Sequence, residues 1–418
     1  MSHQPGLMRP VATLFSGTVI AQGIPFLAAP LIARQYGPDQ FAVFGTLMAV
    51  FNILNVLAAA RYEMAVVMPA RDEESADLVR GALVISVIMG VLSFGAVHVF
   101  ALSTRLAERL PGLPDVAWIA ALLAVLAGSQ VVLQQWLLRR KRFGAVARAK
   151  VVQAVGITVA TVGLGYFGVT SGLELGYLIG WTGFTLATAW WVFGREPLTG
   201  SFDRARSLTA LSAYKEWPLV NTWPALINAM ASGMATFYMA SYFEGEVAGQ
   251  HNFVRQYVLV PVSMITVALG QVLFVRASEH VREGRTLLPE LSRVFGVLLI
   301  GAVALVAIMV FFGEPLFQWI FGERWTYAGT AGRYLVFGYA VQLVSSPFNV
   351  VLLALRQVKL TILFPLVFMG MLSVLPIFRH VAPLRFMGLL SGVEVLAYAL
   401  QATVVFWCVR RYDRSLTA

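Results

Sequence analysis

The sequence predicts an all-α polytopic membrane protein with twelve transmembrane helices, arranged in two six-helix lobes with a central cavity. Three observations predict it: twelve nearly uncharged stretches, a mean hydropathy of +0.75, and Lys and Arg in every second gap. A helix needs about 20 apolar residues to cross a bilayer, and it satisfies its own backbone there. The stretches are apolar on all sides, whereas long helices of a soluble protein would carry amphipathic stripes.

The twelve stretches can be read along the chain in order. They cover residues 10–33, 41–60, 81–104, 116–138, 151–173, 175–194, 217–243, 247–275, 294–313, 334–355, 360–378 and 386–409. Two ionised side chains interrupt them, Arg255 in the eighth stretch and Glu394 in the twelfth. The loops between the stretches are too short to hold a soluble domain.

The basic residues predict the orientation. With the N-terminus inside, 23 of the 31 Lys and Arg lie in inner loops, 7 lie in outer loops, and Arg255 lies within a helix. Basic residues are in excess on the cytoplasmic side of membrane proteins. Both termini are therefore predicted to be cytoplasmic. The charge of +10 is explained by this topology, so it does not indicate nucleic acid binding, although basic clusters also attract anionic lipid headgroups.

Several function classes lack the residues they need. Cys408 is the single cysteine, so it forms no disulfide and no cysteine metal cluster within the chain. The five histidines lack the close spacing of a zinc site. The sequence contains no P-loop, no glycine-rich phosphate cradle and no serine nucleophile elbow. We therefore expect no catalytic residues, no metal and no cofactor, and a protein that is not an enzyme.

The two halves of the chain resemble each other. A short turn follows the first stretch at Tyr36-Gly37-Pro38 and the seventh at Phe243-Glu244-Gly245, and the fourth and tenth stretches end in similar apolar runs. Parallel repeats of this kind are common in transporters. The predicted organisation is an N-terminal lobe at 1–194, a cytoplasmic linker at 195–216 and a C-terminal lobe at 217–418.

Polar side chains within the stretches are candidates for lining a cavity, because polar groups in lipid are costly. The candidates are Arg255, Gln22, Asn221, Asn228, Gln271, Gln342 and Asn349. For each amide, a hydrogen bond between packed helices is the alternative explanation. As a set they concentrate in few helices, which favours a cavity between the two halves.

Several segments resemble one known family. They are residues 17–38 in the first helix, Arg61-Tyr62-Glu63 with the following apolar run and Pro69, and in the second half residues 214–221, 321–329 and 345–347. They resemble the oligosaccharide flippases of the polysaccharide-transport branch of the multidrug/oligosaccharidyl-lipid/polysaccharide exporter superfamily. The sequence departs from the family at Ala60, where a glycine is usual, and at Ala42.

The resemblance implies a transporter that moves an undecaprenyl-pyrophosphate-linked oligosaccharide across a bacterial inner membrane, for surface polysaccharides such as lipopolysaccharide O-antigen or exopolysaccharide. Its implied partners are the lipid-linked oligosaccharide, membrane lipids and polysaccharide assembly proteins, with no nucleic acid. Arg255 would then attract the pyrophosphate. Alternatively, Arg255 and Glu394 form a buried ion pair. Arg61 and Glu63 form either a gate or a structural ion pair.

Two other functions remain alternatives. A cation-coupled multidrug antiporter of the same fold would need a carboxylate within the membrane, and the first six stretches contain none. A membrane glycan polymerase or ligase would need a large outer loop that bears catalytic groups, and the outer loops are short. Both observations favour the flippase.

Overall fold

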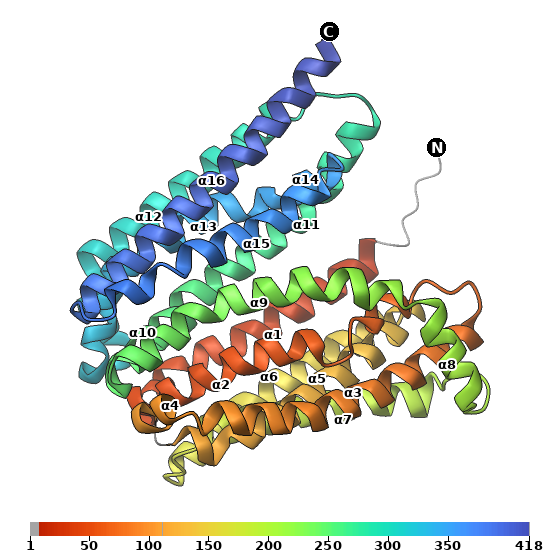
Figure 1. Ribbon diagram of the computed structural model, residues 1–418, viewed down its shortest axis with the longest axis horizontal. Helices are drawn as coiled ribbons and strands as arrows, with labels where there is room; N and C mark the ends of the chain where they lie inside the picture. Colours follow the sequence, from red (N-terminus) through yellow and green to blue (C-terminus); the bar gives the residue numbers. More distant parts are fainter. Residues whose placement is uncertain (1–7, 111, 418) are drawn as a thin grey trace. The chain divides into compact units, whose positions relative to one another are not determined.

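Figure 1 shows the computed structural model, which describes residues 8–110 and 112–417. All regular elements in these residues are helices. Contacts divide the chain into two compact units, Met1–Ala229 and Met230–Ala418. The division lies within helix α9 (Glu216–Tyr242), after the predicted start of the second lobe at residue 217.

The first unit is built from six long helices. These are α1 (Met8–Gln35), α2 (Pro38–Leu57), α3 (Asp72–Ala101), α5 (Leu113–Arg139), α6 (Phe143–Tyr166) and α7 (Gly172–Arg195). Three short elements join or follow them, namely η1 (Tyr62–Ala65), α4 (Thr104–Arg109) and α8 (Arg204–Ala213). Helix α8 falls in the predicted linker and packs on α3, so this part of the linker is folded against the first unit.

After α9, the second unit continues with further long helices, several of them interrupted by other turns. Its elements are α10 (Gly245–Val254), η2 (Arg255–Leu259), α11 (Val260–Arg282), α12 (Leu288–Phe321), η3 (Glu323–Trp325), α13 (Thr326–Ser345), η4 (Ser346–Val350), α14 (Val351–Ala354), α15 (Val358–Leu372), η5 (Leu375–Phe378) and α16 (Pro383–Thr417). Each of the twelve predicted stretches thus corresponds to one helix or one continuous helical segment.

Nine of these segments, within the described residues, are long and apolar enough to cross a membrane. The remaining three, α1, α7 and α9, have 28, 24 and 27 residues, which is also long enough. In α7 and α9, the Gly, Thr, Tyr and Trp residues lower the mean hydropathy. The prediction of an all-α multi-pass membrane protein is confirmed.

Helix α5 is the centre of the first unit, where it packs against α2, α3 and α7 (Figure 1). Its Trp136 is fully buried in a core that includes residues of α3, α6 and α7. Helices α6 and α7 pack closely because glycines of α7 face α6. A Cβ on Gly180 of α7 would lie 2.7 Å from the backbone nitrogen of Ile157 in α6. Small residues of this kind let membrane helices approach each other closely.

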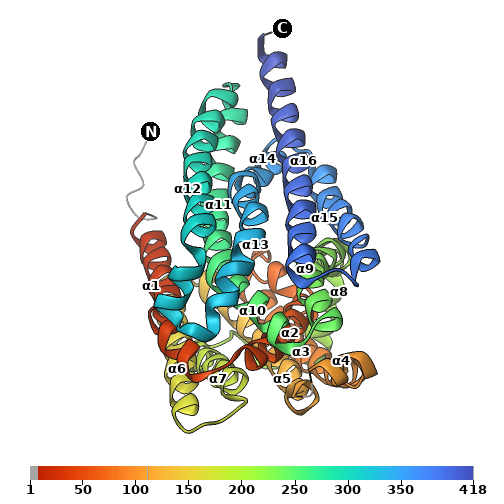
Figure 2. The same ribbon diagram turned by 90° about the vertical axis from the view of Figure 1, so that its left-hand side faces the viewer.

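Helix α13 has the corresponding place in the second unit, with α10, α12 and α16 packed around it (Figure 2). Gly313 of α12 and Gly329 of α13 meet backbone to backbone, since a Cβ on Gly329 would lie 2.5 Å from the carbonyl oxygen of Gly313. At the other end of these helices, Phe348, Val351 and Val405 are fully buried in a common core.

The two units repeat the same pattern of contacts. In the first, α3 packs on α5, α5 on α7, α2 on α5 and α6 on α7. In the second, α12 packs on α13, α13 on α16, α10 and α11 on α13, and α15 on α16. These are the same pairs in corresponding positions along each half. The duplication expected from short sequence similarities is therefore a duplication of helix packing.

The turns are duplicated as well. After α5, Lys141 has φ +56°, and Arg142 N–H donates to the carbonyl of Leu137. After α14, Arg356 has φ +60°, and Gln357 N–H donates to the carbonyl of Leu352. Both helices therefore end in the same left-handed cap, which satisfies carbonyls at the helix end.

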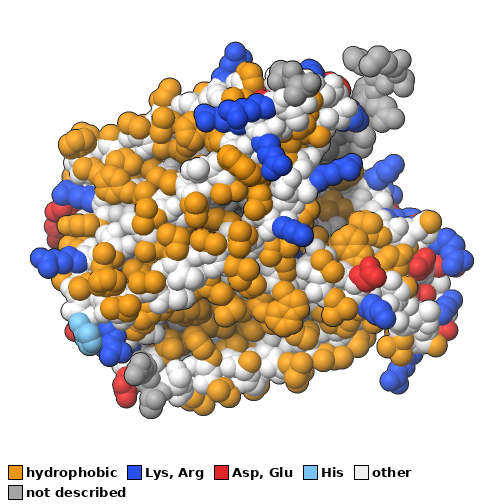
Figure 3. All heavy atoms as spheres, turned by 45° about the horizontal axis from the view of Figure 1, so that its top comes forward, with side chains coloured by type: hydrophobic (Ala, Val, Ile, Leu, Met, Phe, Trp, Pro, Cys, Tyr) orange, Lys and Arg blue, Asp and Glu red, His pale blue; other side chains and the backbone are white. Residues whose placement is uncertain are grey.

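Figure 3 shows one face of the molecule, where hydrophobic side chains cover most of the surface and charged side chains gather mainly toward its ends. Many large apolar side chains are more than half exposed, including Leu27, Val303, Phe311 and Trp319. A water-soluble protein rarely exposes so much contiguous apolar surface. The surface is that of a protein surrounded by lipid chains instead of water.

The segment after α2 contains two consecutive residues other than glycine with a left-handed backbone. Ala60 has φ +46° and Arg61 has φ +63°. A residue with a Cβ loses roughly 1–2 kcal/mol in this conformation. Glycine, which has no Cβ, would adopt the conformation of residue 60 without this cost.

Ala60→Gly is therefore expected to stabilise the protein. The relief of strain exceeds the added entropy of the unfolded chain, so the net gain should be about 0.5–1 kcal/mol, seen as a higher midpoint of thermal unfolding in detergent. Ala58→Gly is the matched control, because Ala58 has an ordinary helical φ of −53° and should lose stability. Equal destabilisation by both substitutions would show that the left-handed turn is not strained.

The orientation can be tested at one exposed residue on each side. In a Cys408→Ser background, cysteine at the exposed Lys141 should resist a membrane-impermeant thiol reagent in intact cells and react after lysis. Cysteine at the exposed Glu108 of α4, on the predicted outer side, should react in both conditions. The reverse pattern would invert the predicted topology.

Candidate functional site

A π-helical turn, η2, joins α10 to α11 and begins at Arg255. The N–H of Val260 donates to the carbonyl of Arg255, five residues earlier. Pro261 explains the wide turn, because proline has no N–H and its ring clashes with the carbonyl four residues before it, that of Tyr257. Such π turns occur frequently at functional sites. This one positions the single basic residue of the predicted stretches.

Arg255 is held by the neighbouring helix α9. Its Nη1 donates to Thr236 Oγ1 at 3.1 Å, and its Nη2 donates to the carbonyl oxygen of Ser232 at 2.6 Å. Ser232 and Thr236 are one helical turn apart, so both face Arg255. The side chain is half-buried. Neutral partners therefore hold this guanidinium.

Glu394 of α16 lies near Arg255 but does not form the ion pair that the sequence suggested. No salt bridge joins them among the described residues, although the Arg255 charge acts on Glu394 electrostatically. Glu394 is 9% exposed, and its Oε2 has no hydrogen-bond partner. Gly338 of α13 makes room for it, since a Cβ there would lie 2.1 Å from Oε2. The contact pair is absent because the guanidinium turns toward α9.

Three further side chains complete what we call the intramembrane cluster, which consists of Arg255, Glu394, His251, Tyr339 and Tyr398. Both charges act electrostatically on Tyr339 and Tyr398, and Arg255 also acts on His251. His251 is 1% exposed, and its Nδ1 has no hydrogen-bond partner. The sequence analysis missed these three residues, because single aromatic and histidine residues carry no spacing signal.

The predicted amide candidates are spread over several helices. Asn221 donates to the carbonyl of Trp217 in its own helix at 3.0 Å, and Gln342 of α13 donates to Ser263 Oγ of α11 at 3.4 Å. Gln342 thus makes the kind of bond between helices that was the alternative explanation. Asn349 has a buried Oδ1 without a hydrogen-bond partner.

The three remaining amide candidates do not show a shared cavity. Asn228 and Gln271 are exposed. The side chain of Gln22 lies outside the described residues. The assignment of these amides to one cavity stays a prediction.

The first unit contains a buried carboxylate that lies just outside the predicted stretches. Glu174 lies in the first turn of α7, one residue before the predicted stretch at 175–194, and is 1% exposed. Its Oε2 has no hydrogen-bond partner, and its charge acts on Tyr36 of α1. The argument against cation coupling, which relied on the absence of a carboxylate in this half, is therefore weaker than the sequence suggested.

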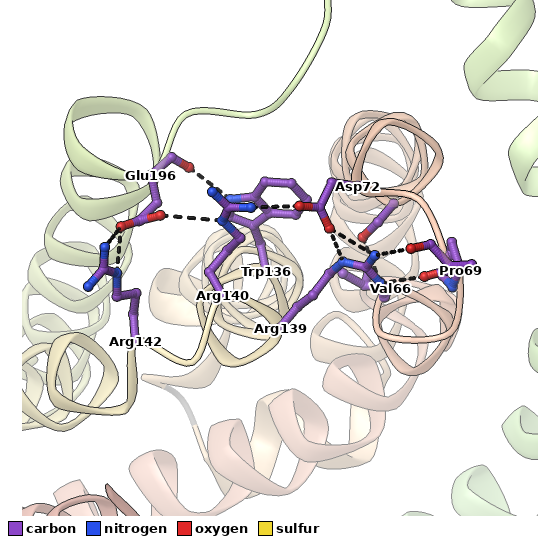
Figure 4. Close-up of polar contacts among 10 residues, drawn as sticks. Val66, Pro69, Asp72, Trp136, Arg139, Arg140, Arg142 and Glu196 are labelled. Atoms are coloured by element: carbon purple, nitrogen blue, oxygen red, sulfur yellow. Dashed lines mark hydrogen bonds and ion pairs between the residues drawn. The ribbon is translucent and has the colours of Figure 1, made fainter. Parts of the chain in front are cut away.

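A second polar region lies at what we call the basic end of the first unit, the helix ends next to residues 61–80, 139–150 and 195–206. Figure 4 shows its central network. Asp72 accepts from Arg139 at 2.9 Å and from Arg140 at 2.6 Å, while Glu196 pairs with Arg140 at 3.3 Å and with Arg142. Alternating acids and arginines thus join α3, α5 and the segment after α7.

Backbone groups extend this network. Trp136 Nε1 donates to the carbonyl of Glu196 at 2.8 Å, and Arg139 Nη1 donates to the carbonyl of Pro69 at 2.7 Å. These arginines are therefore structural at the basic end, whereas the sequence analysis considered them only as topology signals. This network could have been predicted from the sequence, because Asp72 and Glu196 lie close to basic residues at the edges of the predicted loops.

Arg61 and Glu63 form the predicted ion pair, with Arg61 Nη1 3.5 Å from Glu63 Oε1. Glu63 lies in η1, outside the predicted stretches, and is 7% exposed. Burial raises the pKa of the Glu63 carboxyl, and the Arg61 charge opposes this shift only in part. Glu63 Oε2 and Arg61 Nε have no hydrogen-bond partners. The pair is thus poorly satisfied, whether it serves as a gate or as a structural contact.

The Glu63 pKa makes stability depend on pH. A carboxyl whose folded-state pKa is raised stabilises the fold when protonated, and this contribution is lost as pH rises from 4.5 through the folded pKa. Glu63→Gln should therefore be more stable than the wild type at pH 8, and the difference should shrink toward pH 4.5. Thermal unfolding across this range measures it. A variant less stable than the wild type at pH 8 would show that the Arg61 pair outweighs burial.

The family model described as polysaccharide biosynthesis protein matches residues 31–329, more than half of the chain. Among curated proteins, no sequence relative matches. Groups of three or more His, Cys, Asp or Glu arranged to hold a metal are absent from the described residues.

Several solved structures share the fold. An inward-facing multidrug resistance MATE family transporter of the MOP superfamily has a TM-score of 0.72 and 16% identity, over 96% of this chain and 99% of that one. The lipid II flippase MurJ, in an inward closed conformation, has a TM-score of 0.75 and 12% identity, over 97% and 90%. A MOP superfamily transporter from Pyrococcus furiosus has a TM-score of 0.61 and 17% identity, over 98% and 96%. The chain thus belongs to the polysaccharide biosynthesis protein family and has the fold of MOP superfamily transporters.

Proposed function

We propose that the protein is a flippase that moves a lipid-linked oligosaccharide, carried on undecaprenyl pyrophosphate, across the bacterial inner membrane. The observation that carries the proposal is the match to the polysaccharide biosynthesis family over residues 31–329, joined to a multi-pass fold shared with a lipid II flippase. The product would serve surface polysaccharide biosynthesis, such as that of O-antigen or exopolysaccharide.

The substrate is amphipathic and anionic, and the intramembrane cluster suits its charged part. A pyrophosphate that crosses hydrocarbon needs cationic or hydrogen-bonding partners. Arg255 is held by a hydroxyl and a carbonyl rather than by a carboxylate, so its charge is not cancelled by direct contact. In our proposal, Arg255 attracts the pyrophosphate.

The sugar would be recognised by uncharged polar side chains. Gln22, Asn221, Asn228, Gln271, Gln342 and Asn349 are the proposed cavity residues. Amide groups both donate to and accept from sugar hydroxyls. Asn349 Oδ1, which lacks a protein partner, supports this role best.

Transport would occur by alternating access. The two lobes would rock against each other around a cavity between them, as in other transporters built from repeats. The duplicated packing of the two units supports this mechanism. The linker at 195–216 and the Arg61–Glu63 pair would then lie on the cytoplasmic side, where the pair acts as a gate or a structural contact.

A cation-coupled multidrug antiporter is the second candidate. Glu174 and Glu394 favour it, because each is a buried carboxylate with an oxygen that lacks a hydrogen-bond partner, and solved MATE transporters share the fold. A membrane glycan polymerase or ligase is a weaker candidate, since the segments between the predicted outer helix ends are short.

Reconstitution separates these candidates. Purified protein in liposomes should make a lipid-linked oligosaccharide on one leaflet accessible to a glycan-cleaving enzyme added to the other side, with the glycan length unchanged. Export of a cationic dye driven by a proton or sodium gradient, without glycan movement, would favour the antiporter. A change in glycan length would identify an enzyme.

Arg255 should matter more for transport than for folding. We expect Arg255→Ala to reduce flipping by about tenfold or more, since it removes a charge-assisted contact, and Arg255→Lys to retain partial activity because the charge remains. Thr236→Val is the matched control: it removes one partner of the guanidinium and leaves the charge in place. Thermal unfolding of all three variants shows whether they fold. Full flipping by well-folded Arg255→Ala would remove Arg255 from the mechanism.

A further inference from the structure

A small crevice lies at the end of α16, away from the intramembrane cluster. We call it the α16 crevice, and its volume is about 320 Å³. Seven residues line it: Leu355, Gln357, Trp407, Cys408, Arg411, Tyr412 and Ser415. The α16 residues recur at the spacing of one helix face, and the first two belong to the turn between α14 and α15. Each of the two segments contributes both apolar and polar residues to the lining.

The left-handed cap after α14 forms one side of the crevice. Arg356 has φ +60°, and the Gln357 N–H donates to the carbonyl of Leu352 at 2.7 Å. This geometry reverses the chain and brings Leu355 and Gln357 beside α16. The helix is anchored below the crevice, because Val405 and Val409 are fully buried. The crevice is thus part of the fold.

The charge around the crevice is strongly positive. Arg356, Lys359, Arg410, Arg411 and Arg414 lie in its two segments, and Asp413 is the single acid there. The Asp413 carboxylate accepts the N–H groups of Leu287 and Leu288, each at 2.9 Å, at the start of α12. It therefore caps that helix and offsets the helix dipole. The crevice keeps a net positive potential.

One charged side chain in the lining offers donors to a ligand. The Arg411 guanidinium lies over the Trp407 ring, 5.7 Å from its centroid. Arg411 is exposed, so the edges of its guanidinium are open to a ligand in the crevice. A phosphate oxygen accepts charge-assisted hydrogen bonds from such a group.

The apolar part of the lining indicates a lipid. Leu355 and the exposed Trp407 supply it, each near the end of a helical segment that is long and apolar enough to cross the membrane. Tryptophan favours this headgroup level, and basic residues here attract anionic lipids. At roughly 30 Å³ for each water molecule, the crevice has the room of about ten waters, which is enough for a small phosphate headgroup.

We propose that the α16 crevice binds the phosphate headgroup of an anionic phospholipid. Arg411 holds the phosphate, and the glycerol lies against Leu355 and Trp407. The diphosphate of a polyprenyl carrier shares this chemistry, and the experiment distinguishes the two sources. The proposal does not depend on the transport function.

Cys408 lines the crevice, is 7% exposed and is the single thiol, so the rate of its slow modification reports occupancy. The wild-type protein is placed in nanodiscs of phosphatidylcholine with increasing fractions of phosphatidylglycerol, and modification by N-ethylmaleimide is timed. We expect modification to slow in a saturable way. In Arg411→Gln, half protection should need about fivefold more phosphatidylglycerol. Arg411→Lys, which keeps the charge, should retain part of the protection.

Arg379→Gln is the matched control, because Arg379 is an exposed arginine far along the chain from the crevice, and its protection should equal that of the wild type. Equal slowing in Arg411→Gln and the wild type would overturn the proposal, as would no effect of phosphatidylglycerol. Protection by undecaprenyl phosphate in phosphatidylcholine, with none by phosphatidylglycerol, would assign the crevice to the carrier and contradict the phospholipid. Lipid retained in native mass spectrometry gives an independent count for folded Arg411→Gln.

Discussion

A charge within hydrocarbon has to be satisfied by the helices around it, and this constraint shapes the second unit. Hydrogen bonds to a carbonyl and a hydroxyl of α9 offset the desolvation cost of Arg255. The π turn that starts at Arg255 follows from Pro261, which removes a backbone donor in the middle of a continuous helical segment. One proline and one arginine therefore decide how α9 and the α10–α11 segment fit together.

Close helix approach is the second condition, because it brings buried polar groups within range of each other. Glu394 fits against α13 only because position 338 has no side chain. Ser391, one turn earlier on α16, accepts the Gly338 N–H at 2.9 Å. The α13–α16 contact is therefore polar and tight at the same level. Its glycine would be as sensitive to substitution as the carboxylate itself, although glycine carries no chemistry of its own.

Much of the fold follows from the sequence, since each of the twelve apolar stretches corresponds to a helical segment, and short turn similarities reflect a real repeat of packing. The site was less predictable. Sequence gives the depth of Arg255 along its helix but not which neighbour it faces, so Glu394 was a reasonable partner and Thr236 was not foreseen. Glu174 was missed because the apolar stretch begins one residue later, whereas the helix begins two residues earlier.

The two units repeat the packing of their helices, but they do not repeat the positions of their charged side chains. Helix α10 begins at Gly245, and Arg255 follows ten residues later. Helix α2 begins at Pro38, and the residue ten positions later is Met48. The duplicated helices thus place an arginine in one half and an apolar residue in the other. Meanwhile, the arginines at the basic end of the first unit are engaged by Asp72 and Glu196. The arginine inside the membrane is therefore specific to one half, so any role of this charge in recognising an anionic substrate would be asymmetric, even though the packing is repeated.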